Sequence, residues 1–343
     1  MKDKIKFGLA GCGYAGNIYG EILTRLNEAQ LECVCDVDKK KLNEFSKKFG
    51  VRKLFTNFEE MLKEKVDAII IATPNHLHSK MCIAAAKEGK HVLVEKPMAL
   101  NLRDANRMIK TCKDANVKLS VVFQYRFCPP ALKLKEIINK KLLGNLIFGC
   151  ATLIWKRDKT YFREALWRGK RLSAGGGVLI HQAIHMIDLL QWYFGSVEKM
   201  YAYVDRLLHE IEVEDVAAGL IKFQNNACGT ILATTASSTN LSPTLSVYGT
   251  AGSVSIENFK YGGVVKTFGR NLDIIKNATY PHFNNSSGEI PVYAKNHAAQ
   301  IVNFISAIKG KGKLLIDGEE GKKPLEIVLN MYKLAKTKFL EGK

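Results

Sequence analysis

Residues 5–16 read IKFGLAGCGYAG, a short apolar strand that runs into a Gly-x-Gly-x-x-Gly turn and then into a helix. In such a turn the first glycine bends tightly, the second lets the backbone approach a pyrophosphate, and the third lets the helix lie close to the strand. The amides at the helix N-terminus face the anion. The stretch therefore predicts a nucleotide-phosphate site, although similar turns also occur for packing reasons alone. Its residues are Gly11, Cys12, Gly13, Tyr14, Ala15 and Gly16.

A second apolar strand, residues 31–35, ends at Asp36, twenty residues after Gly16. A dinucleotide-binding fold places its ribose-binding acid at this distance. The carboxylate of Asp36 can accept hydrogen bonds from both ribose hydroxyls and would repel a 2′-phosphate. We therefore expect NAD as cofactor rather than NADP, although the lysines at 39–41 weaken that expectation.

The composition is that of a globular protein with 343 residues and 47% hydrophobic side chains, a length that suits two domains. No apolar run reaches the roughly eighteen residues that a membrane span needs, and no signal-peptide core follows the first methionine. We expect a cytoplasmic protein without a membrane partner. The eight cysteines form no Cys-x-x-Cys pair and no metal-finger spacing, so we expect reduced core thiols.

The net charge of +18 comes from lysine clusters that are spread along the chain. A nucleic-acid binder more often shows one basic face interleaved with aromatic residues, or a recognisable module, and neither is evident. We therefore expect no nucleic-acid partner. A solvated lysine-rich surface explains the charge, and attraction of an anionic substrate is the alternative.

Short β-rich runs alternate with helical runs from residue 5 to residue 123, which predicts a doubly wound parallel sheet in a dinucleotide-binding domain, residues 1–123. Two polar segments follow strands of this sheet at their carboxyl ends, where ligands bind in open α/β sheets. We therefore expect both to face the cofactor, with a simple turn and a surface lysine as the alternatives. They are Thr73, Pro74, Asn75 and His76 after the strand at 66–72, and Glu95 and Lys96 after the strand at 91–94.

The remainder of the chain, residues 124–343, shows a different pattern. From residue 146 strands with alternating polar and apolar residues follow one another through turns, which predicts an antiparallel sheet with one covered face. A helix is expected at 131–143, and residues 267–291 are expected to form a long irregular loop. The second domain is thus predicted to be α+β.

Three glycines, residues 175–177, precede an apolar helix on which His181, His185 and Asp188 share one face. Two histidines four residues apart can be half of a metal site, but no third ligand with metal-like spacing is evident, so we expect no metal. A structural histidine pair and acid/base catalysis remain the two alternatives.

Together these motifs resemble the Gfo/Idh/MocA family of sugar oxidoreductases over essentially the whole chain. The glycine turn, Asp36, the 73–76 segment and the Glu95-Lys96-Pro97 triplet match, as does the glycine run that leads to His185. The triplet and the glycine run in combination are specific to that family. The chain departs from the family at His181, because an acid or amide is common at that position.

The resemblance implies a Rossmann domain followed by a domain with an open antiparallel sheet, and a homodimer or homotetramer built through that sheet. It implies an NAD or NADP cofactor and a sugar, cyclitol or nucleotide sugar as substrate. Carried onto matching positions, Lys96 is the catalytic lysine and His185 the proton-transferring histidine. His181 is placed close enough to contact the substrate or tune His185.

The chemistry is consistent with these roles. Hydride departure from a secondary carbinol requires removal of the hydroxyl proton and stabilisation of the developing oxyanion. His185 is suited to the first task and Lys96 to the second, and both are expected to contact substrate. Arg126, Trp167 and Arg168 are expected to line the substrate side. A redox-neutral glycoside-modifying enzyme with retained NAD and a non-catalytic dinucleotide sensor are the competing interpretations.

Overall fold

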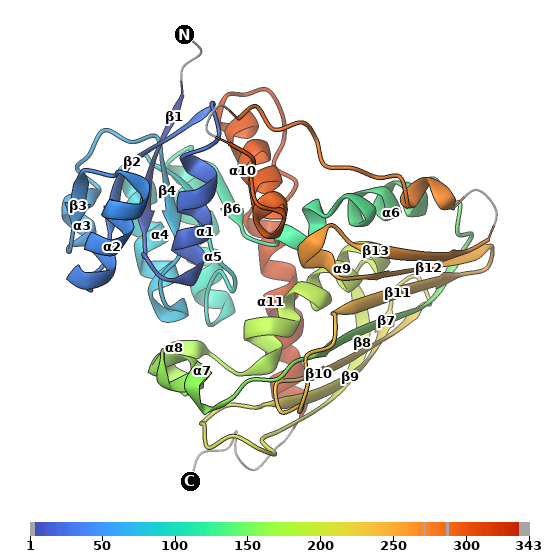
Figure 1. Cartoon of the computed structure of the whole chain (residues 1–343). Helices are drawn as coiled ribbons and strands as arrows, with labels where there is room; N and C mark the ends of the chain where they lie inside the picture. Colours follow the sequence, from blue (N-terminus) through green and yellow to red (C-terminus); the bar gives the residue numbers. More distant parts are fainter. Residues whose placement is uncertain (1–3, 270–271, 286–287, 336–343) are drawn as a thin grey trace. The chain divides into compact units, whose positions relative to one another are not determined.

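The structure is a computed structural model that describes residues 4–269, 272–285 and 288–335. Packing divides the chain into two compact units. The first comprises residues 1–124 and 281–322, and the second comprises residues 125–280 and 323–343. In Figure 1 the first unit accordingly combines blue and cyan elements with the orange helix α10. The limits of the dinucleotide-binding domain, residues 1–123, stay a prediction.

The first unit contains the expected parallel sheet, with strand order β3-β2-β1-β4-β5-β6. All four residues of β4 are buried, as burial on both faces of a parallel sheet requires. The order reverses direction between β1 and β4, which creates the point where ligands bind in such folds. The strands are β1 (Ile5–Ala10), β2 (Ala29–Cys35), β3 (Lys53–Phe55), β4 (Ala68–Ile71), β5 (His91–Val94) and β6 (Leu119–Val121).

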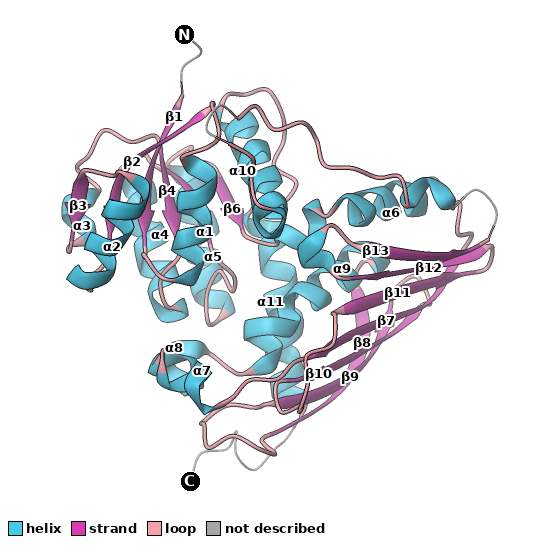
Figure 2. Cartoon of the chain, in the orientation of Figure 1, coloured by secondary structure: helices cyan, strands magenta, loops and turns pink. Residues whose placement is uncertain are grey.

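Helices connect these strands, and Figure 2 shows them around the sheet. Helix α1 packs beside α2 and α10, and α4 packs beside α5. Helix α10 contributes Phe304, whose ring centroid lies 6.4 Å from that of Phe7 on β1, and Gln300, whose side chain donates to the carbonyl of Val121 at 2.7 Å. The helices are α1 (Tyr14–Leu23), α2 (Lys39–Phe49), α3 (Phe58–Met61), α4 (His78–Lys87), α5 (Leu102–Asp114) and α10 (Lys295–Ile308), with 3₁₀ turns η1 (Asn75–Leu77) and η7 (Val292–Ala294).

The second unit contains a seven-stranded sheet with order β13-β12-β11-β7-β10-β9-β8. It is mostly antiparallel, as expected, but β7 and β10 pair in parallel. Strand β13 was not predicted, because it has only five residues, at the edge of the sheet, and its positions alternate between exposed and half-buried with none fully buried. The strands are β7 (Leu146–Ile154), β8 (Val197–Asp205), β9 (Val216–Phe223), β10 (Cys228–Thr234), β11 (Thr244–Gly249), β12 (Gly252–Glu257) and β13 (Val264–Phe268).

One face of this sheet packs on α9, where Gly149 of β7 leaves room for Leu190 and Phe194. The predicted helix at 131–143 is shorter and begins earlier, because the prolines at its start suit the first turn of a helix. The helices are α6 (Pro129–Asn139), α7 (Lys159–Arg163), α8 (Arg171–Ala174), α9 (Ile184–Phe194) and α11 (Gly318–Leu334), with η2 (Gln124–Phe127), η3 (Leu166–Gly169), a π-helical turn η4 (Leu179–Ala183), η5 (Phe259–Tyr261) and η6 (Asp273–Ile275).

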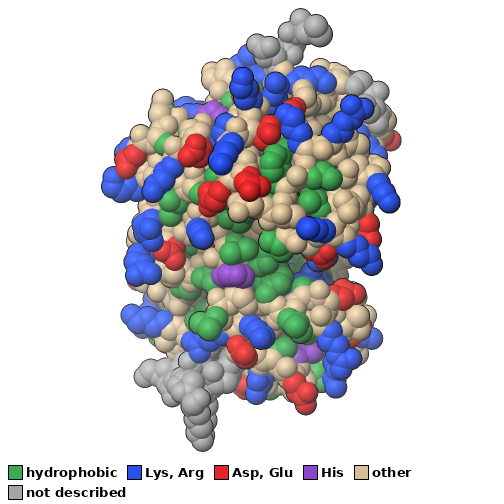
Figure 3. Space-filling view, turned by 90° about the vertical axis from the view of Figure 1, so that its left-hand side faces the viewer, with side chains coloured by type: hydrophobic (Ala, Val, Ile, Leu, Met, Phe, Trp, Pro, Cys, Tyr) green, Lys and Arg blue, Asp and Glu red, His purple; other side chains and the backbone are tan. Residues whose placement is uncertain are grey.

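Lysine and arginine side chains are distributed over the surface. On the face shown in Figure 3 they are interspersed with acidic and apolar side chains and do not merge into one basic patch. In the described part of the chain, every helix is too short or too polar to cross a lipid bilayer.

Candidate active site and cofactor site

The first glycine turn joins β1 to α1. Gly11 has a φ of 100°, and a side chain there would overlap the carbonyl oxygen of Ala72. A side chain at Gly16 would overlap the carbonyl oxygen of Gly11, so the helix does lie close to the strand. By contrast, a Cβ atom at Gly13 would meet no atom of the described residues within 4 Å. This open space fits a ligand that approaches the backbone closely, as a pyrophosphate does in dinucleotide folds.

Asp36 lies beside this turn, directly after β2. One of its carboxylate oxygens accepts the N–H of Cys12 at 2.7 Å, and the other accepts the N–H of Asp38 at 2.9 Å. An ionised carboxylate has about four acceptor positions, so capacity for ribose hydroxyls remains. Burial, followed by the negative charge of Asp36, raises the pKa of the Cys12 thiol to about 12. Tyr14 starts α1 and its side chain is exposed, whereas Ala15 is half-buried.

The segment after β4 is tied to the segment after β5 by His78. Its Nδ1 lies 2.8 Å from the carbonyl oxygen of Pro97, and its Nε2 lies 2.8 Å from that of Thr73. Both groups are acceptors, so a neutral ring can donate to only one of them. Burial nevertheless lowers the pKa of His78. Of the neighbouring predicted residues, Pro74 is half-buried and precedes the 3₁₀ turn, Asn75 is buried and His76 is exposed.

Glu95 holds the backbone at Lys96. Its Oε1 accepts the hydroxyl of Tyr19 at 2.7 Å, and its Oε2 accepts the N–H of Lys96 at 3.2 Å. Burial raises the pKa of Glu95, while the charge of Lys96 acts in the opposite direction. Lys96 is followed by a cis bond to Pro97. The first unit thus brings the glycine turn, Asp36 and both predicted polar segments to the carboxyl ends of its strands.

The second glycine run, in the second unit, is organised by a carboxylate. Glu214 is buried, and it accepts the N–H of Gly177 at 2.7 Å, the N–H of Leu179 at 3.0 Å and the hydroxyl of Tyr332 at 2.7 Å. A side chain at Gly177 would overlap the carbonyl oxygen of Glu214. Burial raises the pKa of Glu214, against the three hydrogen bonds, which favour its ionised form.

The two predicted histidines lie on different kinds of helical turn. His181 lies in the π-helical turn η4, and His185 lies in the first turn of α9. The ring of His181 packs on Trp167 with centroids 5.3 Å apart, and the ring of His185 packs on Tyr125 with centroids 5.0 Å apart. The two rings thus have different aromatic neighbours. The sequence did not indicate the π-helical turn.

Arg126 is fully buried in an ion pair with Asp188. Its Nη2 lies 2.7 Å from one carboxylate oxygen of Asp188, and its Nε donates to the other at 2.9 Å. The guanidinium also lies 5.0 Å from the ring centroid of Trp192. A buried, bidentate pair of this kind favours a structural role for Arg126. Its predicted contact with substrate stays a prediction.

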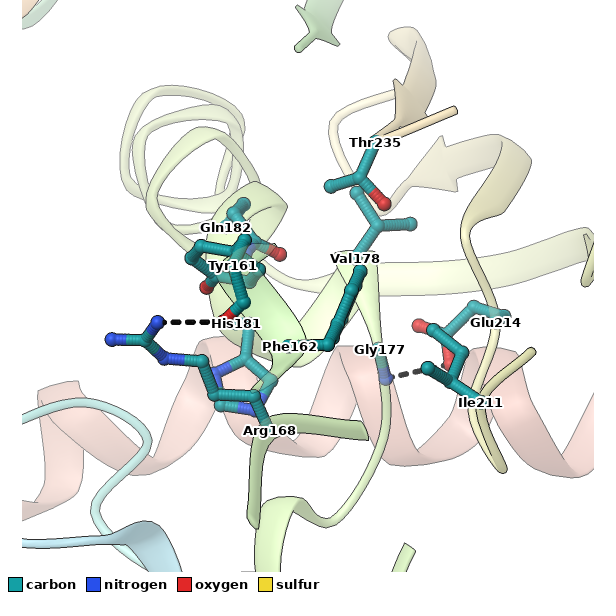
Figure 4. Close-up of a pocket in the computed structure, with 10 residues that line it drawn as sticks. All are labelled: Tyr161, Phe162, Arg168, Gly177, Val178, His181, Gln182, Ile211, Glu214 and Thr235. Carbon is teal, nitrogen blue, oxygen red and sulfur yellow. Dashed lines mark hydrogen bonds between the residues drawn. The ribbon is translucent and has the colours of Figure 1, made fainter. Parts of the chain in front are cut away.

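A small cavity of about 10 Å³, roughly the space of one water, lies beside His181. Figure 4 shows Arg168 and Gln182 converging on Tyr161: Arg168 donates to the Tyr161 carbonyl at 2.9 Å, and Gln182 donates to the Tyr161 hydroxyl at 3.0 Å. The structure therefore brings Trp167, Arg168 and His181 together. The cavity lining comprises Tyr161, Phe162, Arg168, Gly177, Val178, His181, Gln182, Ile211, Glu214 and Thr235.

Sequence reasoning missed three residues of this region: Arg157, Tyr161 and Glu214. Arg157 and Tyr161 lie in a segment dense in basic and aromatic residues, which is a signal that could have been used. Glu214 is far from the glycines in sequence and lies among other acidic residues, so nothing in the pattern distinguishes it. Among the described residues, no three His, Cys, Asp or Glu side chains gather as a metal site would need.

Comparison with known families and proteins gives matches along the chain. Residues 5–123 match the model described as an oxidoreductase family with an NAD-binding Rossmann fold, and residues 131–255 match the GFO/IDH/MocA C-terminal domain. The myo-inositol 2-dehydrogenase of Thermotoga maritima is 28% identical over 332 residues, which cover 94% of this chain and 93% of the relative.

Solved structures give the same result. The WlbA dehydrogenase from Bordetella pertussis, in complex with NADH and UDP-GlcNAcA, superposes with a TM-score of 0.87 at 30% identity, covering 98% of this chain and 96% of that one. A levoglucosan dehydrogenase in complex with NADH shares the fold, with a TM-score of 0.86 at 22% identity and 97% of each chain covered.

Proposed function

The chain belongs to the Gfo/Idh/MocA family of oxidoreductases with an NAD-binding Rossmann fold, and on that premise we propose that it transfers a hydride between a nicotinamide cofactor and a carbinol or keto carbon. The proposed substrates are a sugar, a cyclitol or a nucleotide sugar. The observation that carries the proposal is the combination of an open glycine turn with Lys96 and His185 at the positions that match the family's motifs. The relatives named above support it, because they act on or bind compounds of these classes.

The residues of the first unit fit a dinucleotide. The turn at residues 11–16 would hold the pyrophosphate on backbone amides, and Asp36 would accept hydrogen bonds from the adenosine ribose. The 73–76 segment and Glu95 would line the remainder of the cofactor. When bound, nicotinamide supplies the acceptor or donor of the hydride. We propose NAD as the preferred cofactor, because the Asp36 carboxylate would repel a 2′-phosphate; a higher kcat/KM with NADP would overturn this assignment.

His185 is the proposed general base, which takes the hydroxyl proton during oxidation and returns it during reduction. Lys96 is proposed to stabilise the charge that develops on the same oxygen. Glu95 supports that role by accepting the Lys96 backbone N–H. His181 is proposed to contact the substrate or to tune His185. It does not need to be the base.

A substrate screen that follows NADH absorbance across cyclitols, aldoses and nucleotide sugars tests this function. Lys96→Ala should keep NADH binding within a few fold and lower turnover by about two orders of magnitude, because its role lies in the transition state. His185→Asn should lower kcat by about a hundredfold, and His181→Asn should act more mildly, mainly on KM and the pH profile.

Several outcomes would contradict these assignments. Activity that survives Lys96→Ala would make that lysine a surface residue, and an indispensable His181 with a replaceable His185 would move the proton path. If His181→Asn and His185→Asn lose equal activity and both have lower melting temperatures than the wild type, a structural histidine pair is favoured. Metal content, measured alongside, would show whether either variant loses a bound ion. NADH binding without turnover of any carbinol would favour a sensor.

We also propose a homodimer or homotetramer built through the second sheet. The face opposite α9 exposes large apolar side chains on three neighbouring strands, namely Tyr201 on β8, Leu220 on β9 and Leu232 on β10. A cytoplasmic protein would need to cover such a patch. Light scattering should give a multiple of the 38.3 kDa chain mass, and Leu220→Asp should shift it toward one chain.

A further inference from the structure

A strongly basic segment of the second unit contains a pair of arginines that share one aromatic ring. Residues 156–171 read KRDKTYFREALWRGKR, with seven basic and two acidic side chains. The guanidinium carbon of Arg168 lies 4.3 Å from the ring centroid of Tyr161, and that of Arg157 lies 5.0 Å from it. Arg157 also lies 4.7 Å from the ring centroid of Trp155. The aromatic faces attract both cations and fix their orientation.

The charges of these two arginines are not balanced by acidic side chains. The ion pairs found among the described residues involve neither Arg157 nor Arg168. Each makes one hydrogen bond to a backbone carbonyl, Arg157 to Lys156 and Arg168 to Tyr161. A guanidinium has five N–H donors, so both retain donor capacity, and the Nε of Arg157 is buried without a hydrogen-bond partner.

Nearby acidic groups are engaged elsewhere. Glu214 accepts three hydrogen bonds from the glycine run and Tyr332. Asp215 accepts the N–H groups of Leu207, Leu208 and His209. Asp158 caps α7 by accepting the N–H of Tyr161. Two like charges on one ring therefore repel each other without a carboxylate between them, which is a situation that a bound anion would relieve.

The arginine pair is also held in place and connected to the histidine helix. The N–H of Arg157 donates to the carbonyl of Thr235 at 3.0 Å, and its own carbonyl lies 2.9 Å from Nε2 of His209. Tyr161 accepts the side-chain N–H of Gln182, the residue after His181. Arg168 lines the same cavity as His181. If the arginines bind an anionic group of the substrate, the rest of that substrate would extend toward His181.

We infer that Arg157 and Arg168 form an anion-binding subsite, and that the substrate is a sugar or cyclitol that carries a phosphate or a carboxylate. The planar fork of each guanidinium matches the oxygens of either group. This inference rests on the proposed function and narrows its substrate class. The basic side chains at 156–171 add a field that attracts such a substrate.

The test compares glucose, glucose 6-phosphate and glucuronate as substrates of the full-length protein with NAD. An anionic sugar should show a KM at least tenfold below that of glucose, and higher salt should reduce this advantage. Arg157→Gln and Arg168→Gln should each bring the KM for the anionic sugar to within a few fold of the KM for glucose. Arg168→Lys, which keeps the charge and loses the fork, should retain part of the advantage. Arg163→Gln, an exposed arginine of the same segment, is the matched control and should retain all of it.

A second readout does not require turnover. Inorganic phosphate and glucuronate should each raise the melting temperature of the wild type and of Arg163→Gln but not of Arg157→Gln or Arg168→Gln. The compound with the larger effect identifies the anion.

If the variants and the wild type use all three sugars equally, the anion subsite is wrong and the proposed function stands. If none of these sugars and no compound of the cyclitol, aldose and nucleotide-sugar screen is oxidised, and the anion-induced stabilisation still depends on Arg168, the subsite stands and the proposed function is wrong. If Arg157→Gln does not fold, Arg168→Gln decides.

Discussion

Each unit of the molecule contains a glycine-rich turn ahead of a helix, and the two turns are filled differently. In the first, Asp36 accepts one amide of the turn, that of Cys12, and the space at Gly13 is open in the described structure. In the second, the carboxylate of Glu214 accepts the amides of Gly177 and Leu179. An internal anion thus occupies the second turn, whereas the first leaves room for an external one.

This difference shows that a glycine run indicates that some group comes close to the backbone. It does not indicate whether that group is a ligand or a side chain of the protein. At the first turn the spacing to Asp36 supplied the missing information, because it is typical of a nucleotide fold. At the second turn the partner is a protein side chain 37 residues away in sequence. Substitutions at the two turns should therefore affect different properties.

The largest effect is expected for Gly177→Ala. The added Cβ would overlap the carbonyl oxygen of Glu214, and the backbone on both sides is buried, so we expect a loss of about 3 kcal/mol or more in the free energy of unfolding. Thermal denaturation of the purified protein measures it. Gly195→Ala is the control, because Gly195 has a φ of 87° and no described atom within 4 Å of the added Cβ; it should cost about 1 kcal/mol. Equal losses would mean that the contact with Glu214 is unimportant.

Glu214→Gln should destabilise the protein by about 2 kcal/mol. The new side-chain NH2 replaces one of the two carboxylate oxygens, so one backbone N–H of the glycine run loses its acceptor. Burial raises the pKa of Glu214 above its ordinary value of 4.5, so its contribution is fully present below that value and is lost as pH rises through the raised pKa. The difference in melting temperature between wild type and variant should therefore shrink as pH rises from below 4.5 through the raised pKa. Glu212→Gln, at an exposed neighbour, should show neither effect. A difference that grows with pH would contradict the assigned direction.

Gly13→Ala should leave the fold intact and weaken NADH binding by about tenfold or more, which corresponds to about 1.4 kcal/mol. The added methyl group meets no described protein atom and occupies the space assigned to the pyrophosphate. Titration of NADH fluorescence gives the affinity, and the melting temperature without cofactor gives the control. Unchanged affinity would place the cofactor elsewhere.

The smallest effect is expected for Asp36→Asn. The amide oxygen can still accept the N–H of Cys12. The N–H of Asp38 loses its acceptor, but that residue is only half-buried and water can replace the lost bond, so the melting temperature without cofactor should change little. Removal of the charge should narrow the preference for NAD over NADP by less than tenfold, or less than about 1.4 kcal/mol. The ratio of kcat/KM values for the two cofactors measures it. A large loss of stability would show that Asp36 serves the turn more than the cofactor.

Most of the fold could be predicted from the sequence because its signals are local. The apolar run at β4 indicates a strand that is buried on both faces, and the alternation of polar and apolar residues in β9 indicates a strand with one buried face. The parallel pairing of β7 with β10 could not be predicted, because it joins strands that are separated by more than seventy residues. The return of α10 to the first unit was missed for the same reason.

The candidate site divides in the same way. The cofactor side follows from spacing along the chain, and the structure brings those residues to one edge of the first sheet. In the second unit, the ion pair of Arg126 with Asp188 depends on packing between distant segments, and the stacking of Arg157 on Tyr161 depends on how the two side chains are oriented in the folded chain. Residue types alone do not distinguish an arginine that is buried with an acid from one that retains donors for a ligand.

The order of the chain has a consequence for how the protein can be divided. The chain passes between the units after residues 124, 280 and 322, so each unit is built from two separate segments of the sequence that alternate along the chain. A protein that stops at residue 124 would lack α10, and with it the Phe304 ring that packs near Phe7 and the Gln300 side chain that donates to the carbonyl of Val121. Neither half can therefore be obtained by a single cut of the gene or by one proteolytic cleavage. A soluble cofactor-binding unit would have to rejoin residues 1–124 to residues 281–322.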